Sequence, residues 1–269
     1  MQIVGGTLRD SVTSDVNTAV TNFTSNLSAA EFALRYKEDG LTGGHVIMLG
    51  GGNDVAARSA LSAYRDGFQV GGGVTPSNAQ SLIDDGAASV IVTSYVFTDG
   101  KIDKTRLLEL VKCVGKYKLV LDLSCRKRLK RKRCEEGGVE EGKTAPAHSL
   151  LETDQVEYVV VTDRWQKWTD CVVNSDLLMD LSSYCSEFLV HGVDVEGLRQ
   201  GVEDDLVVLL GEHSPIPVTY AGGIRNIEDV EKIAKLGKGR VDFTVGSALD
   251  LFGGDFKYAD LLEWNARNQ

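Results

Sequence analysis

The sequence predicts an α/β fold in which parallel strands close into a (β/α)8 barrel, and three observations predict it. Short apolar segments rich in β-branched residues alternate with helical segments along the chain. The apolar segments are nearly continuous, which is typical of strands buried on both faces of a parallel sheet. Two of them, far apart in the chain, end on adjacent glycines and then pass into helices.

Each element follows from local signals. The first helix is expected over residues 28–40, because Ser28 can cap its start and Gly40 can end it. The segment 45–50 is short, β-branched and bounded by glycine, so it is expected to be a buried strand. By the same signals, further strands are expected at 68–73, 89–96, 118–124, 158–163, 187–194, 217–223 and 241–248, and further helices at 54–67, 76–86, 103–115, 175–185, 203–213, 226–237 and 258–269.

An open doubly wound sheet would also alternate strands and helices, and the glycines decide between the two. A dinucleotide-binding fold places one GxGxxG turn after its first strand. Here residues 71–96 resemble residues 221–249: each block runs from a glycine corner through a helix to a strand with a small or hydroxylated end. Such an internal duplication of a β-α-β unit fits a closed ring of strands.

The strand count is seven when the segment 158–163 is assigned to an excursion from the barrel. A barrel of this geometry needs eight strands, because seven leave two unpaired edges. The chain is therefore expected to begin just after its first strand. We expect one TIM-barrel domain over residues 1–269.

Residues 126–156 are expected to form a disordered insertion after the strand at 118–124. They open with a basic octet at 126–133, a composition found in nuclear-import signals and nucleic-acid patches. An acidic, glycine-rich run follows at once, which favours a solvated insertion. A retained intron in the gene model is an alternative.

Composition bounds the function. The 42% of hydrophobic residues in 269 suffices for a large core, and the formal net charge of −10 argues against sequence-independent DNA binding. No apolar run reaches membrane-spanning length, and the N-terminus does not have the layout of a signal peptide, so we expect a soluble intracellular protein. His45, His148 and His213 form no ligand pattern with His191, and no metal is expected. The cysteines contain no CxxC pair and are expected to be reduced thiols: Cys113, Cys125, Cys134, Cys171 and Cys185.

The glycine corners are candidate phosphate sites. Glycine allows close approach to the backbone, hydroxyl groups donate hydrogen bonds, and the following helix N-terminus adds partial positive charge. A single Gly-Gly pair is usually a tight turn, but two equivalent pairs with matching downstream strands favour binding. The first site is expected to combine Gly72 and Gly73 with Thr93 and Ser94, and the second Gly222 and Gly223 with Gly246 and Ser247.

Seven blocks, in this order, resemble the eukaryotic form of the histidine-biosynthesis isomerase that acts on ProFAR, a phosphoribosylformimino-aminoimidazole carboxamide ribotide: "QIVGGTL", "FQVGGGV", "LVLDLS", "VTDRWQKW", "FLVHGVD", "PVTYAGGI" and "FTVGSALDLFGG". The resemblance covers nearly the whole chain except about residues 126–156. It implies a TIM barrel built by half-barrel duplication, a monomer, and no metal or organic cofactor. It also implies a substrate with a phosphate at each end, which matches the two glycine corners.

The reaction implied is an Amadori rearrangement, in which an aminoaldose opens its ribose ring and becomes an aminoketose. Ring opening needs an acid at the ring oxygen, and the later proton shift from C2 needs a base. By resemblance, Asp122 in "LVLDLS" is the general acid, at the carboxyl end of a strand where barrel chemistry resides. The residue alone fits a turn cap or an ion pair equally well.

The resemblance also marks residues on two other segments. His191 stands where bacterial relatives carry a threonine that contacts the reacting ribose, so it is expected to bind substrate or share in proton transfer; a core histidine is the alternative. Asp194 is expected to orient His191 or to cap the next helix. Arg164 and Trp165 are expected to close over the substrate, with the indole on the imidazole and the guanidinium on a phosphate. A loop tryptophan packed on the barrel rim is the alternative.

The base of the family lies on a first strand that this sequence does not show. Loss of one of two proton-transfer groups typically costs about 10²-fold to 10⁴-fold in rate, so this chain is expected to be a poor isomerase if it is the whole protein. The alternatives are the sister cyclase of the same pathway and a non-catalytic phosphate-binding protein. The cytoplasm is the expected location, with a plastid as the alternative, since algal and plant members carry transit peptides.

Overall fold

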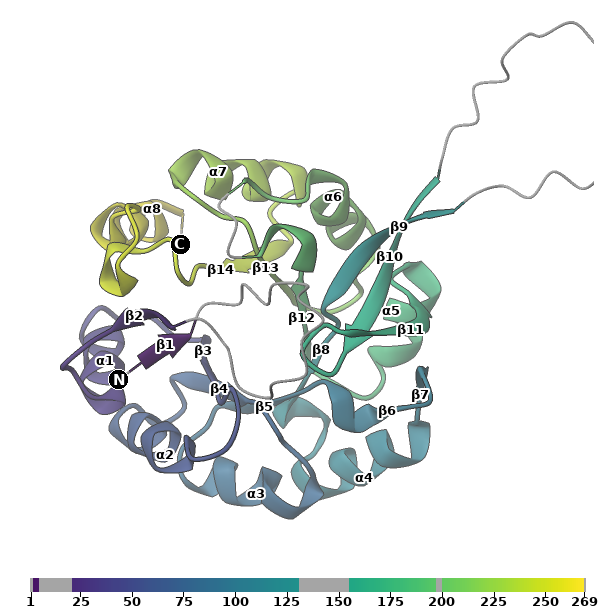
Figure 1. Ribbon diagram of the computed structural model, residues 1–269, viewed down its shortest axis with the longest axis horizontal. Helices are drawn as coiled ribbons and strands as arrows, with labels where there is room; N and C mark the ends of the chain where they lie inside the picture. Colours follow the sequence, from purple (N-terminus) through teal and green to yellow (C-terminus); the bar gives the residue numbers. More distant parts are fainter. Residues whose placement is uncertain (1, 5–20, 131–154, 197–199, 269) are drawn as a thin grey trace, which may run out of the picture.

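Seven parallel strands form the centre of the computed structural model, which describes residues 2–4, 21–130, 155–196 and 200–268. The sheet curls into a ring with the helices on its outside (Figure 1). Its strand order is β14-β13-β12-β8-β5-β4-β3. The strands are β3 (Gly44–Ile47), β4 (Phe68–Gly71), β5 (Ser89–Val92), β8 (Leu119–Asp122), β12 (Glu187–His191), β13 (Val218–Ala221) and β14 (Val241–Thr244). This sheet confirms the α/β barrel class and the seven strands expected.

The helices begin within one residue of the expected positions, but those expected at 54–67 and 175–185 end four residues early, at Ala63 and Leu181. Ser28 caps α1 in a reciprocal capping box with Glu31, and Gly40, at φ +69°, follows the helix end. Asp103 caps α4 with its side chain. The helices are α1 (Ala29–Glu38), α2 (Asp54–Ala63), α3 (Pro76–Asp84), α4 (Lys104–Val114), α5 (Ser175–Leu181), α6 (Asp204–His213), α7 (Ile227–Leu236) and α8 (Tyr258–Asn268); single 3-10 turns are η1 (Ser94–Val96), η2 (Lys116–Lys118), η3 (Val193–Val195) and η4 (Asp250–Phe252).

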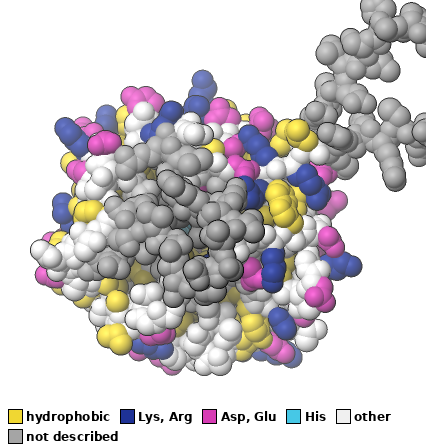
Figure 2. Space-filling view, in the orientation of Figure 1, with side chains coloured by type: hydrophobic (Ala, Val, Ile, Leu, Met, Phe, Trp, Pro, Cys, Tyr) yellow, Lys and Arg dark blue, Asp and Glu magenta, His cyan; other side chains and the backbone are white. Residues whose placement is uncertain are grey.

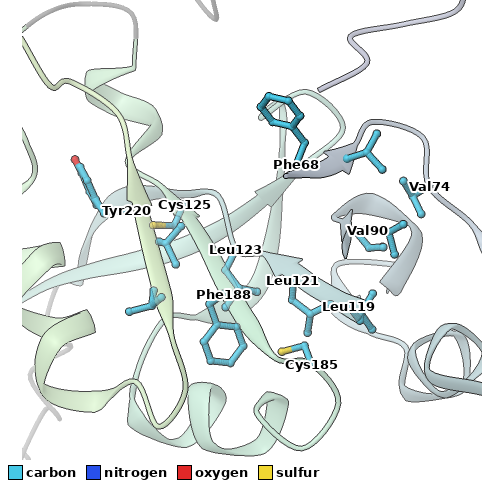
Figure 3. Packing of buried hydrophobic residues seen from close by; sticks show 14 of the residues in the cluster. Phe68, Val74, Val90, Leu119, Leu121, Leu123, Cys125, Cys185, Phe188 and Tyr220 are labelled. Carbon is cyan, nitrogen blue, oxygen red and sulfur yellow. The ribbon is translucent and has the colours of Figure 1, made fainter. Parts of the chain in front are cut away.

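The hydrophobic core has two parts because successive side chains of a strand point to opposite faces. Leu119 and Leu121 of β8 point outward and pack with Phe188 in the large cluster between strands and helices (Figure 3). Val120 points inward and joins a small cluster of four buried residues, with Ile91, Leu189 and Ala221. The period of two therefore places Asp122 on the inward face, at the mouth of the ring.

The two ends of the sheet are not paired with each other. Within the described residues, β3 and β14 each lack a strand partner on their outer side. Helix α1 and the start of α8 bridge this seam instead: the Tyr258 hydroxyl donates to Oδ2 of Asp39 at 2.8 Å, and Tyr36 packs on the Tyr258 ring. Phe32 contacts Phe252 beside them.

An antiparallel arm leaves the ring between β8 and α5 (Figure 1). It consists of β9 (Cys125–Lys130), β10 (Gln155–Thr162) and β11 (Lys167–Val172), with β10 in the middle. The assignment of 158–163 to an excursion is thus confirmed. The ends of the insertion expected at 126–156 are paired strands, and its centre, 131–154, lies outside the described residues. Two hairpins complete the fold: β1 (Gln2–Val4) with β2 (Thr21–Thr24), and β6 (Phe97–Thr98) with β7 (Lys101–Ile102).

Candidate functional site

Asp122 ends the middle strand of the sheet and is largely buried, with 14% of its side chain exposed. Its Oδ1 accepts hydrogen bonds from the Ser124 backbone N–H at 2.9 Å and the Ser124 hydroxyl at 2.7 Å. Its Oδ2 accepts from the Thr93 hydroxyl at 3.1 Å. Three donors around one carboxyl group stabilise its ionised form.

His191 ends the neighbouring strand β12, which runs parallel to β8 with Leu189 opposite Asp122. The Nδ1 atom of His191 lies 3.6 Å from Oδ1 of Asp122, slightly beyond hydrogen-bond length. Burial disfavours the charged form of both groups. The attraction between them and the hydrogen bonds donated to Asp122 outweigh this effect of burial. The pKa of Asp122 is lowered and the pKa of His191 is raised. The arrangement favours a carboxylate beside an imidazolium.

His45, on β3, is a third titratable group near this pair. Its Nε2 atom is buried and has no hydrogen-bond partner. Burial, and then the charge of His191, lower the pKa of His45 to about 4, so it is neutral at pH 7. His45 lies in a predicted barrel strand, where alternate residues face the inside of the barrel, and this position was the sequence signal that could have identified it as a site residue.

The first glycine corner follows β4. Gly72 and Gly73 have φ of +93° and +70°, and a side chain at Gly72 would collide with the carbonyl oxygen of Met48. The structure directs the two nearby hydroxyl groups to protein partners: Thr93 donates to Asp122, and Ser94 accepts from the backbone N–H of Asp163 at 3.2 Å. The Ser94 hydroxyl can still donate its proton to a ligand, whereas the Thr93 hydroxyl already donates its proton to Asp122.

The second corner follows β13 and repeats the first. Gly222 and Gly223 have φ of +115° and +73°, close to the values at Gly72 and Gly73. They line one open, shallow pocket together with Gly246 and Ser247. Glu196 also lines this pocket, and sequence reasoning did not mark it.

The two corners lie symmetrically about Asp122. Strand β4 is second from one end of the sheet, β13 is second from the other, and β8 is the fourth of seven. Because all seven strands are parallel, both corners and Asp122 lie at the same mouth. A long ligand with an anionic group at each end would therefore present its middle to Asp122 and His191.

The turn between β10 and β11 brings Trp165 to the mouth. Three consecutive residues, Asp163, Arg164 and Trp165, have φ of +51°, +59° and +66°, a conformation that costs free energy for side-chain-bearing residues. The Trp165 ring centroid lies 6.0 Å from that of His191. Arg164 is exposed. The turn thus brings the indole, rather than the guanidinium, to the Asp122–His191 pair.

Other candidate residues lie elsewhere. Asp194 accepts hydrogen bonds from Arg126 and from the backbone of Lys127, and the expectation that it orients His191 or caps a helix stays a prediction. His213 ends α6, away from the sheet's mouth, and His148 lies outside the described residues. Within the described ranges, no three His, Cys, Asp or Glu residues are grouped so that they could hold a metal ion. The described cysteines are free thiols.

Comparison with known proteins gives consistent matches. The family model described as histidine biosynthesis protein matches residues 14–257. A chloroplastic protein of Medicago truncatula is 50% identical over 266 residues, which cover 98% of this chain and 77% of the relative. Proteins of Yarrowia lipolytica and Neurospora crassa are 44% and 43% identical, each covering 99% of this chain and 93% of the relative. All three are named 1-(5-phosphoribosyl)-5-((5-phosphoribosylamino)methylideneamino)imidazole-4-carboxamide isomerase.

Proposed function

This chain belongs to the family of histidine biosynthesis proteins, and on that premise we propose how it acts as an aldose–ketose isomerase on ProFAR. The relatives' name describes a molecule with two phosphoribosyl groups. One observation carries the assignment of the site: the Asp122–His191 pair lies midway between two glycine corners of matching backbone conformation.

We assign the acid role to His191 and the base role to Asp122. His191 gives its proton to the ribose ring oxygen as the bond from that oxygen to C1 breaks. Asp122 then takes the proton from C2 to form the enolamine. Protonation of C1 and loss of the O2 proton complete the aminoketose, so the atoms and electrons balance within the substrate. The resemblance implied the acid role for Asp122, but three hydrogen-bond donors support its ionised form.

The remaining groups position the substrate. The corners at Gly72–Gly73 and Gly222–Gly223 bind the two phosphates through backbone N–H groups, helped by the hydroxyls of Ser94 and Ser247. Trp165 stacks on the imidazole ring of the substrate. His45, neutral and unpartnered, hydrogen-bonds the opened ribose. Arg164 reaches a phosphate when substrate is bound.

We further propose a monomer that does not bind nucleic acid. On the face that Figure 2 shows, the described basic and acidic side chains are interspersed. In the described part of the chain, no helix combines the length and apolar character needed to cross a bilayer. We propose a cytoplasmic location; the chloroplastic name of the Medicago truncatula relative supports a plastid as the alternative.

The test is conversion of ProFAR by the purified chain, compared with Asp122→Asn and His191→Gln. The matched control is Glu212→Gln, which removes a carboxylate paired with Lys238 on the outside of α6. Turnover by the parent and the control, with both site variants reduced at least about 100-fold, supports the proposal. Substrate binding without turnover in the parent would indicate a phosphate-binding protein. Ammonia-dependent consumption of the ribulosyl isomer would indicate the cyclase. Either result overturns the proposal.

A further inference from the structure

The arm begins at the catalytic strand and touches the strand that carries His191. Only Leu123 and Ser124 separate the end of β8 from β9. Cys125 forms a parallel bridge with Gly192, the residue after His191, and its Sγ lies 3.7 Å from the His191 carbonyl oxygen. Strand β9 is therefore connected to Asp122 through the chain and to His191 through the bridge at Gly192.

The next two residues of β9 hydrogen-bond to the residues that follow His191. We call residues 191–196 the His191 segment. The Arg126 Nε–H donates to Oδ1 of Asp194 at 2.9 Å, and the Lys127 backbone N–H donates to Oδ2 at 2.7 Å. Asp194 and Arg126 are each about 30% exposed, so solvent weakens the pair less than it weakens a fully exposed one. One carboxylate thus fixes both the side chain and the backbone of β9.

A second contact lies at the start of α6. The Lys127 ammonium pairs with Glu203, whose side chain is only 10% exposed. The Tyr158 hydroxyl of β10 donates to the same carboxylate at 3.4 Å, and the Glu203 backbone N–H donates to the Tyr220 hydroxyl at 2.9 Å. A nearly buried carboxylate without its cation would be costly in free energy, so Lys127 ties the arm to the start of α6.

The structure assigns a role to the start of the basic run: Arg126 and Lys127 are positioning residues that, through Asp194 and Glu203, hold the His191 segment at its working distance from Asp122. This rests on the proposed function. The first two residues of the run therefore act within the molecule. Its third member, Arg128, pairs with Glu157 of β10, inside the arm itself, and offers a matched control.

The distance matters because the surroundings of His191 carry opposing charges. Asp122 of β8 and Glu196 of the same segment favour its protonated form. His45 of β3, when protonated, opposes it. A His191 segment that moves away from β8 loses most of the Asp122 contribution, so its proton is held less tightly.

The experiment compares Arg126→Met, Asp194→Ala and Arg128→Met in the full chain. The readouts are kcat and KM across pH and the pKa of His191 by NMR of labelled imidazoles, assigned with His191→Gln. We expect Arg126→Met and Asp194→Ala to lower kcat about 10-fold to 100-fold and to lower the pKa of His191. Arg128→Met should stay within about 2-fold, and Arg126→Lys should recover most of the loss.

Two results would overturn the assignment. One is an unchanged His191 pKa in folded Arg126→Met and Asp194→Ala. The other is an equal effect of Arg128→Met, which would show that the arm contributes general stability alone. If the parent chain has no isomerase activity, the proposed function fails, while the NMR titration still decides whether these contacts hold His191.

Discussion

The Nδ1 atom of His191 lies 3.6 Å from Oδ1 of Asp122, across two neighbouring parallel strands. Asp122 already accepts three hydrogen bonds from Ser124 and Thr93. Each partner stabilises the charged form of the other, so removal of either should change both proton transfer and stability.

Asp122→Asn should lower kcat by about 10²-fold to 10⁴-fold, because the amide cannot accept a proton and no longer stabilises the imidazolium. KM should change little, since the glycine corners are untouched. Steady-state kinetics check this, with Glu212→Gln as the control. A kcat within a few-fold of the parent would remove Asp122 from the mechanism.

The pair should also give stability a characteristic pH dependence. The pKa of His191 is raised, so its contribution is complete below its ordinary pKa of about 6.5 and is lost as pH rises through the folded-state value. The pKa of Asp122 is lowered, so its contribution is complete above about 3.9 and is lost as pH falls through the folded-state value.

Urea unfolding from pH 6 to pH 9 measures the first of these contributions. His191→Gln should flatten the decline of unfolding free energy on the alkaline side. A decline identical to that of the parent would show that His191 is not held as a cation.

His45 should act in the opposite direction. With a pKa of about 4 in the folded state, it stays neutral where the unfolded chain takes up a proton. Stability should therefore fall as pH drops below about 6.5, by an amount on the order of 3 kcal/mol by pH 4. His45→Gln should remove this part of the acid destabilisation, as chemical denaturation at pH 7 and pH 4.5 would reveal. Equal acid sensitivity in both proteins would contradict it.

Substitutions at two glycines of the second candidate phosphate site should distinguish an effect on substrate binding from an effect on stability. An added Cβ at Gly246 meets nothing within 4 Å, whereas at Gly223 it would collide with the Gly201 carbonyl oxygen at a φ of +73°. Gly246→Ala should leave the unfolding free energy within about 0.5 kcal/mol and raise KM about 10-fold by narrowing the phosphate site. Gly223→Ala should raise KM and also lose at least about 1 kcal/mol of stability. Thermal melts and kinetics distinguish them; an unchanged KM in Gly246→Ala would exclude the corner as a phosphate site.

Much of the fold could be predicted because local signals agree with the final arrangement. Continuous apolar segments predicted the barrel strands, and the cap Ser28 predicted the start of the first helix. The strand β9 could not be found this way. Its sequence, Cys125–Lys130, is dominated by cations, and acidic partners far along the chain, Asp194 and Glu203, stabilise it.

The site was predictable where backbone geometry governs it and less so where side chains choose partners. Gly222, Gly223, Gly246 and Ser247 do line one pocket. The hydroxyl of Thr93 instead hydrogen-bonds Asp122, a choice that depends on the register of β5 and β8 and is invisible in the sequence. Glu196 was missed because its neighbours in the pocket come from distant segments, whereas the position of His45 in a barrel strand could have marked it.

The contact between Tyr258 and Asp39 has a consequence for how the molecule loosens. The described ends of the ring are joined by side-chain contacts between the α1 region and α8, and not by hydrogen bonds between strands. These contacts can therefore break without the loss of a main-chain hydrogen bond of the sheet. Local opening should therefore start at α1 and α8. Their amide protons should exchange with solvent before those of α3 and α6, whose neighbouring strands are paired on both sides.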